Sequence, residues 1–162
     1  MCRDFNFTLE YLHNGPRSRP SLTTVSFLWR PFLANVSTAL AQLASLPQSQ
    51  RPRVAMFGAG QWDLLHIHDA AHFERQAQGL QNVLELMQRQ QRAEASEKGA
   101  LPWLVATTMP RTTSRFMRDA AKEQHMGATT IAAQNQVLRQ AYESADVVVD
   151  LHKVLELVLL GV

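Results

Sequence analysis

The chain has 162 residues, of which 46% are apolar, and this is the size of one domain with an ordinary hydrophobic core. Its formal charge of +2 comes from arginines scattered along the chain, without a basic stripe or interleaved aromatic residues, which argues against a nucleic-acid partner. Cys2 is the single cysteine, so an intrachain disulfide is excluded, and no apolar run reaches the roughly 18 to 20 residues that span a bilayer.

The first half of the chain contains two strand patterns and one helical pattern. Residues 1–20 mix Asn, Gly, Pro and Arg, which predicts a loop-rich lead-in, and residues 21–162 are expected to form one domain. Apolar and polar residues alternate over 22–29, which predicts a strand, and the spacing over 33–46 predicts a helix. Residues 54–57 are a short apolar run that ends in glycines, which is typical of a strand covered on both faces.

The second half continues the alternation of helices and strands. Residues 73–87 carry apolar side chains at helical spacing, and residues 101–106 form an apolar strand pattern. A helical region over 114–144, broken near Gly127, leads to a β-branched strand at 146–150 and then to another apolar helix. This order predicts an α/β domain with a parallel sheet of about four strands, flanked by helices on both faces.

Polar side chains follow each strand of the expected sheet. Because ligands bind at the carboxyl ends of strands in open α/β sheets, we expect these side chains to meet at one crevice. The candidates are Arg30, Gln61, Trp62, Asp63, His66, Thr107, Thr108, Arg111, Asp150 and His152. The alternative for each residue is an ordinary polar loop position, and for Asp150 it is a cap of the helix that follows.

The glycines and histidines after the 54–57 strand do not predict a cofactor. Gly58 and Gly60 do not complete a dinucleotide fingerprint, because Asp63 stands where the third glycine is needed. Of the nearby histidines, His68 and His72 are spaced to share a helix face, and a third convergent ligand is not evident. We therefore expect no resident metal and no other cofactor.

Three stretches of the chain resemble the SGNH (GDSL-like) hydrolase superfamily. They are F-G-A-G-Q-W-D at 57–63, L-V-A-T-T-M-P at 104–110, and N-Q-V-L-R-Q-A-Y followed by D-V-V-V-D-L-H within 135–152. The resemblance covers residues 22–155 and lies closest to the PC-esterase-like branch, which includes sialic-acid and cell-wall O-acetyltransferase domains. It implies a three-layer, flavodoxin-like α/β fold.

The resemblance assigns roles to only a few positions. Gly60 and Asp63 match the first and last positions of the family's Gly-x-Asn-Asp block, while Trp62 stands in place of the oxyanion-hole Asn, for which its indole N–H is a possible substitute. The family's nucleophilic Ser, in a Gly-Asp-Ser block, has no counterpart. Asp150 and His152 have the wrong spacing for the family's Asp-x-x-His block, which leaves them as weak catalytic candidates. We therefore expect a partial domain that lacks the first strand and the C-terminal catalytic block.

Three hypotheses for function follow. The first is a segment of a carbohydrate O-acyl esterase or acyltransferase, inactive as it stands, whose ligand is an acylated carbohydrate or another small ester. The second is a non-catalytic pseudoenzyme that binds a glycan or a protein. The third is a metal-dependent hydrolase that uses His68 and His72 with Asp63 or Asp69. The usual context of the family implies a secretory-pathway or membrane-associated full-length protein.

Overall fold

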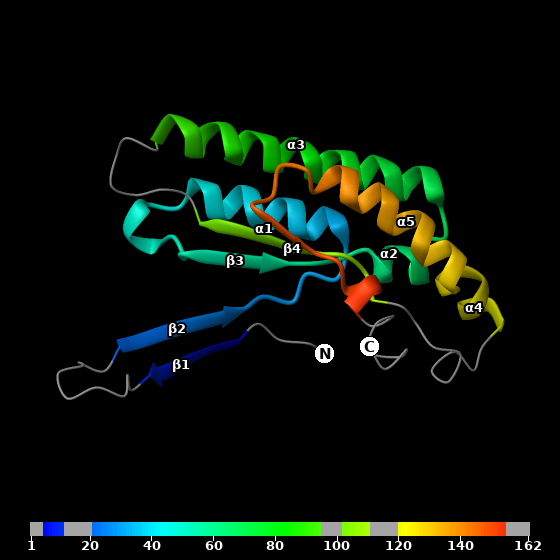
Figure 1. Ribbon diagram of the computed structural model, residues 1–162, viewed down its shortest axis with the longest axis horizontal. Helices are drawn as coiled ribbons and strands as arrows, with labels where there is room; N and C mark the ends of the chain where they lie inside the picture. Colours follow the sequence, from blue (N-terminus) through cyan, green and yellow to red (C-terminus); the bar gives the residue numbers. More distant parts are fainter. Residues whose placement is uncertain (1–4, 12–20, 95–101, 111–119, 155–162) are drawn as a thin grey trace. The chain divides into compact units, whose positions relative to one another are not determined.

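The computed structural model describes residues 5–11, 21–94, 102–110 and 120–154, which divide into two compact units (Figure 1). The first unit is Met1–Arg30 and the second is Pro31–Val162. Each unit is described by itself.

The first unit contains one antiparallel strand pair. Strand β1 (Phe5–Tyr11) pairs with β2 (Ser21–Phe27), so that Phe5 lies opposite Phe27 and Tyr11 opposite Ser21. The prediction of a loop-rich lead-in over residues 1–20 is therefore wrong for β1. The strand predicted at 22–29 forms as β2, but it pairs with its neighbour in sequence, which a short connection permits only in the antiparallel sense.

The second unit is an α/β arrangement, which confirms the predicted fold class at that level. Its three strands pair in the order β3-β4-β5, and both pairs are parallel. The elements are α1 (Leu33–Ser45), a 3-10 turn (Gln48–Gln50), β3 (Val54–Phe57), α2 (Gln61–His66), α3 (Ala70–Glu94), β4 (Trp103–Thr107), α4 (Ala120–Met126), α5 (Ala128–Ala141) and β5 (Val147–Val149). Residues 151–154 begin a further helical turn.

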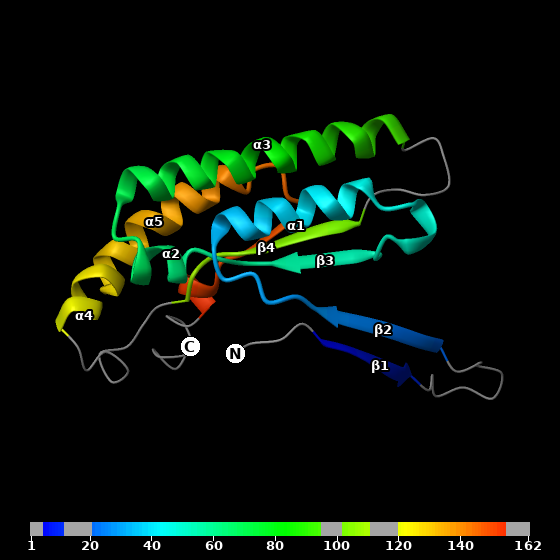
Figure 2. The same ribbon diagram turned by 180° about the vertical axis from the view of Figure 1, so that it is seen from behind.

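Helices α1, α3 and α5 lie on the same side of this sheet (Figures 1 and 2). The two crossovers, from β3 to β4 and from β4 to β5, step across the sheet in the same direction. Because such crossovers are right-handed, both connecting helices come to lie on one face. A fourth parallel strand and helices on both faces are thus not shown in the described part of the chain.

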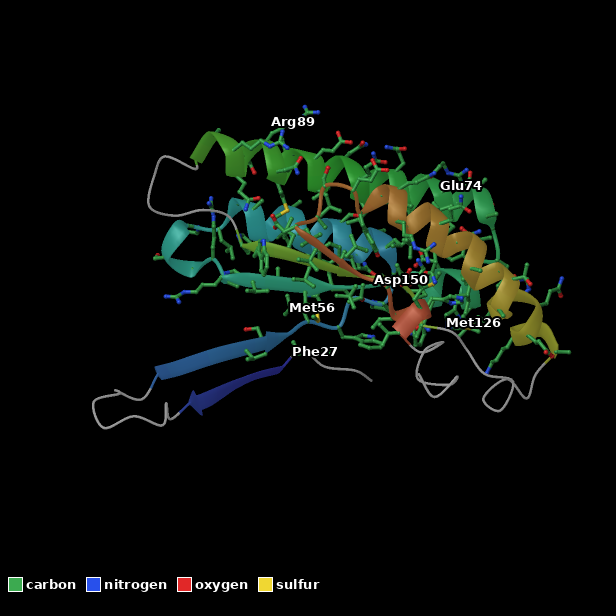
Figure 3. All side chains as sticks on the ribbon, viewed as in Figure 1. Phe27, Met56, Glu74, Arg89, Met126 and Asp150 are labelled. Atoms are coloured by element: carbon green, nitrogen blue, oxygen red, sulfur yellow. The ribbon has the colours of Figure 1, made fainter. Side chains whose placement is uncertain are left out.

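The core lies between this sheet and its helices. The stripe predicted on α3 is confirmed, because Phe73, Ala77, Leu80, Leu84 and Met87 are all at most 1% exposed. The opposite side of α3 is polar, and Figure 3 shows Glu74 and Arg89 projecting from it. The remaining core residues include Leu33, Val36 and Leu40 of α1, Leu104 and Ala106 of β4, and Ile131 and Leu138 of α5. The predicted break at Gly127 separates α4 from α5.

Candidate functional site

The chain turns sharply where β3 ends, and two glycines make this turn possible. A Cβ atom at Gly58 would overlap the Thr107 hydroxyl at the end of β4. Gly60 has a φ of 111°, in the left-handed region, and a Cβ there would lie 3.1 Å from both Met109 Sδ and a Phe73 ring carbon. The turn is therefore packed directly against the end of β4 and against α3, and it requires glycine at both positions.

Asp63, expected in the site loop, points into the protein. The residue is 3% exposed, and its Oδ2 atom accepts the backbone N–H of Leu33 at 3.1 Å. Phe32, the N-cap of α1, has no side-chain capping bond, so Asp63 satisfies a free N–H at the start of that helix from another element. Burial raises the pKa of Asp63, and the Leu33 N–H, its own N–H and His72 partly oppose this shift.

The side chain next to Asp63 points outward. Trp62 is 39% exposed, and its indole stacks on the His66 ring one turn later on α2, with ring centroids 4.6 Å apart and an angle of 27° between the planes. Phe32 meets both rings edge-on, at 6.3 Å from Trp62 and 6.4 Å from His66. We call Phe32, Trp62 and His66 the aromatic cluster. Gln61 is half-buried at the start of α2.

Hydroxyls and an amide hold the end of β4. Thr107 Oγ1 donates to the Phe57 carbonyl at 3.3 Å, and Thr108 Oγ1 donates to Asp150 Oδ1 at 3.0 Å. Asn135 of α5 is fully buried, and its side chain makes two hydrogen bonds to the Met109 backbone. Its Oδ1 atom accepts the Met109 N–H and its Nδ2 atom donates to the Met109 carbonyl, both at 2.8 Å. The two threonines predicted for the crevice thus make bonds that tie the strand ends together.

Both carboxylate oxygens of Asp150 accept hydrogen bonds. Arg139 of α5 donates to its Oδ2 from Nη2 at 2.7 Å and from Nε at 3.1 Å. Oδ1 accepts from Thr108 and from the Lys153 N–H at 3.3 Å, so the predicted helix cap is confirmed. Burial alone would raise the pKa of Asp150, but these bonds and the Arg139 charge outweigh it, and the pKa is lowered. Figure 3 shows Asp150 where the last helical turn begins.

His152 follows on the same helical turn, and its Nδ1 atom is buried without a hydrogen-bond partner. No hydrogen bond joins Asp150 to His152. Among the described residues, no serine or threonine hydroxyl is hydrogen-bonded to a histidine ring, so these residues do not form a nucleophile–base pair.

Tyr142 lies beneath the turn after β3. It is fully buried, its ring meets Phe57 edge-on at 5.7 Å, and its hydroxyl makes no hydrogen bond. Burial raises the pKa of Tyr142, and the nearby Asp63 carboxylate adds to this shift. The phenol therefore stays neutral and supports the turn from the core side.

Sequence reasoning did not single out Asn135, Arg139 or Tyr142 as residues that shape the site. One signal was present, because Asn135 interrupts an otherwise apolar stripe on α5 that runs through Ile131, Leu138 and Tyr142. A polar residue on a buried stripe must find a partner, which indicates a contact with another element.

Two predicted site residues have no described position relative to the strand ends. Arg30 belongs to the first unit, where its Nη1 atom donates to the Trp29 carbonyl at 2.9 Å. Arg111 lies outside the described residues.

The histidines after α2 do not converge on a metal. His68 has a φ of 58°, its Nε2 atom donates to the Leu65 carbonyl at 2.6 Å, and its ring stacks on His125 with centroids 3.7 Å apart. Within the described ranges, no three His, Cys, Asp or Glu side chains are grouped so that they could hold a metal ion. The ligand set of the third hypothesis, with His72 and Asp63 or Asp69, is therefore not assembled there.

None of the helices described has both the length and the apolar character needed to cross a bilayer. The chain matches none of the protein-family models, curated proteins or solved structures with which it was compared. The SGNH-like assignment therefore remains a proposal.

Proposed function

We propose that the chain is an SGNH-like α/β domain related to carbohydrate O-acyl esterases or acyltransferases, and that the carboxyl edge of its sheet binds an acylated sugar without hydrolysing it. The observation that carries the proposal is the turn from Gly58 to Asp63. Gly60, in a left-handed conformation, redirects the chain from β3 into α2, so that Asp63 is buried and Trp62 is exposed. This is the position at which the resemblance assigns the Gly-x-Asn-Asp block.

Two further features are consistent with this function. The strands that would border the ligand are parallel, and their carboxyl ends are joined by Thr107, Thr108 and Asp150, which gives the edge a fixed geometry. The described residues carry no hydroxyl bonded to a histidine ring, which is why we expect binding rather than turnover.

The test uses the full chain and a pair of oligosaccharides that differ only in O-acetylation. A ligand that binds only the folded state, at a concentration of a hundred times its Kd, stabilises the fold by about 2.7 kcal/mol. In a domain of this size, this raises Tm by about 5–10 °C. We expect this shift with the acetylated sugar and a smaller one with the deacetylated sugar. The acetylated sugar should also not be hydrolysed.

Two results would contradict the proposal. Hydrolysis of an aryl acetate that a serine-directed phosphonate abolishes would show that the chain is an active esterase. Equal Tm shifts with both sugars would favour the second hypothesis, a glycan-binding pseudoenzyme, which the exposed Trp62 also supports.

A further inference from the structure

In the aromatic cluster, Trp62 makes ring contacts that an isolated exposed tryptophan lacks. Single exposed apolar side chains are normal on protein surfaces, so the exposure of Trp62 means little alone. Its ring, however, is held by the His66 stack and by the edge of Phe32, and these contacts come from two different elements. Trp103 provides the contrast, because it is 53% exposed at the start of β4 and makes no ring contact with the described residues.

The ring contacts of Trp62 lower the cost of binding a ligand on it. Fixing a side chain on association costs free energy, and a ring that is already fixed avoids much of this cost. Helix α2 buries Asp63 and Leu64 on one side and exposes Trp62 and His66 on the other. The cluster therefore offers a prearranged aromatic surface directly after Gly60.

The charges around the cluster decide which ring fits it. Gln61 is neutral, and the Asp63 carboxylate is turned inward to the Leu33 N–H. At the neighbouring strand ends, Arg139 and Asp150 neutralise each other. A phosphorylated or strongly anionic ligand would find no uncompensated cation among these groups, whereas a neutral sugar needs only an aromatic face and polar neighbours.

We propose that the aromatic cluster is a subsite for a neutral pyranose ring, which stacks its C–H face on the side of the Trp62 indole opposite His66 and places its hydroxyls towards Gln61. The inference rests on the proposed function, since the sugar in this subsite is the carbohydrate part of the acylated ligand. Aromatic contacts of this kind contribute about 0.5–1.5 kcal/mol, so removal of the indole weakens binding up to about tenfold.

The experiment compares three probes on the full chain by ligand-observed NMR titration: an O-acetylated methyl glucoside, the same glucoside without the acetyl group, and ethyl acetate, which has the ester but no ring. Both glucosides are expected to bind the wild type. Trp62→Ala is expected to weaken both by up to about tenfold. Trp62→Phe keeps an aromatic face and should stay within about threefold of the wild type, because most of the stacking area remains.

Trp103→Ala is the matched control, because it removes another exposed indole, from the amino end of a strand, and should leave binding unchanged. The urea midpoint of each variant checks that it is folded. Failure of both glucosides to bind, or an equal loss in the Trp62→Ala and Trp103→Ala variants, would overturn the inference. Binding that depends on Trp62 but is equally tight for both glucosides would keep the inference and remove the acyl-ester proposal. Displacement of the acetylated glucoside by ethyl acetate, with no dependence on Trp62, would do the reverse.

Discussion

Replacement of Asn135 by Ala is expected to be among the most destabilising polar substitutions in the second unit. The side chain is fully buried and is the partner of both the N–H and the carbonyl of Met109, which is itself 2% exposed. The substitution leaves two buried backbone groups without partners. At about 1–3 kcal/mol for each group, the free energy of unfolding falls by about 2–6 kcal/mol.

Urea denaturation followed by circular dichroism measures this loss. With an m value of about 1–3 kcal/mol/M that stays unchanged, the whole effect appears as a lower midpoint. Gln136→Ala is the control, because Gln136 is the exposed neighbour on α5 and its loss should change stability by no more than about 0.5 kcal/mol. A loss below about 1 kcal/mol in Asn135→Ala would refute the reasoning, since the two Met109 groups would then have found other partners.

Asn135→Asp sharpens the test because it separates the two bonds. The introduced carboxylate accepts the Met109 N–H, but it donates to the Met109 carbonyl only when protonated. Its folded-state pKa is therefore raised above the unfolded value of about 3.9. The sign follows directly: the missing bond is restored at acid pH and is lost as pH rises through the folded pKa. The stability gap to Asn135→Ala should thus widen in favour of Asn135→Asp as pH falls.

The remaining predictions concern the turn after β3 and two carboxylates. Gly60→Ala should destabilise the fold by about 1–3 kcal/mol, because of its φ and its contacts, whereas Gly79→Ala, in open space on α3, should stabilise it by about 0.5–1 kcal/mol in the same urea assay. A stable Gly60→Ala variant would show that the turn can relax. Asp150→Asn should cost about 1 kcal/mol at neutral pH, and the cost should disappear as pH falls through the lowered folded pKa of Asp150. Asp63→Asn should behave oppositely, gaining relative to the wild type as pH rises through the raised folded pKa of Asp63. Stability curves with the same pH dependence in both variants would contradict the two assignments.

Local patterns in the sequence predicted the second unit best. The stripe from Phe73 to Met87 on α3 follows from its period alone. The apolar run at Val54–Phe57 correctly predicted a strand, but the predicted cover on both faces is wrong, because Val54 and Met56 are 52% and 69% exposed. A hydrophobic period is a property of neighbouring residues, and the burial that it predicts needs no knowledge of the partner element.

Contacts between distant residues were beyond such patterns. The bond from Asp63 to Leu33 joins residues 30 positions apart, and the bonds of Asn135 to Met109 join residues 26 apart. The pairing of β2 with β1 is likewise a contact between two segments that the pattern within either strand does not specify. A polar residue in a sequence shows that a partner is needed, but only the packing of whole elements decides which backbone group supplies it. The sequence thus predicted that polar side chains gather at the carboxyl ends of the strands, but it did not predict that Asp63 points into the protein.

One helix holds the three strand ends in place. Asn135, Arg139 and Tyr142 occur at intervals of four and three residues on α5 and its end, so they share a face. Asn135 holds the end of β4, Arg139 holds Asp150 after β5, and Tyr142 lies under the turn after β3. Substitutions on this face should therefore change stability and site geometry together. Trp62 projects from α2, outside this set of bonds, and its removal should alter binding while the fold keeps its stability, which makes it the position where recognition can be measured separately.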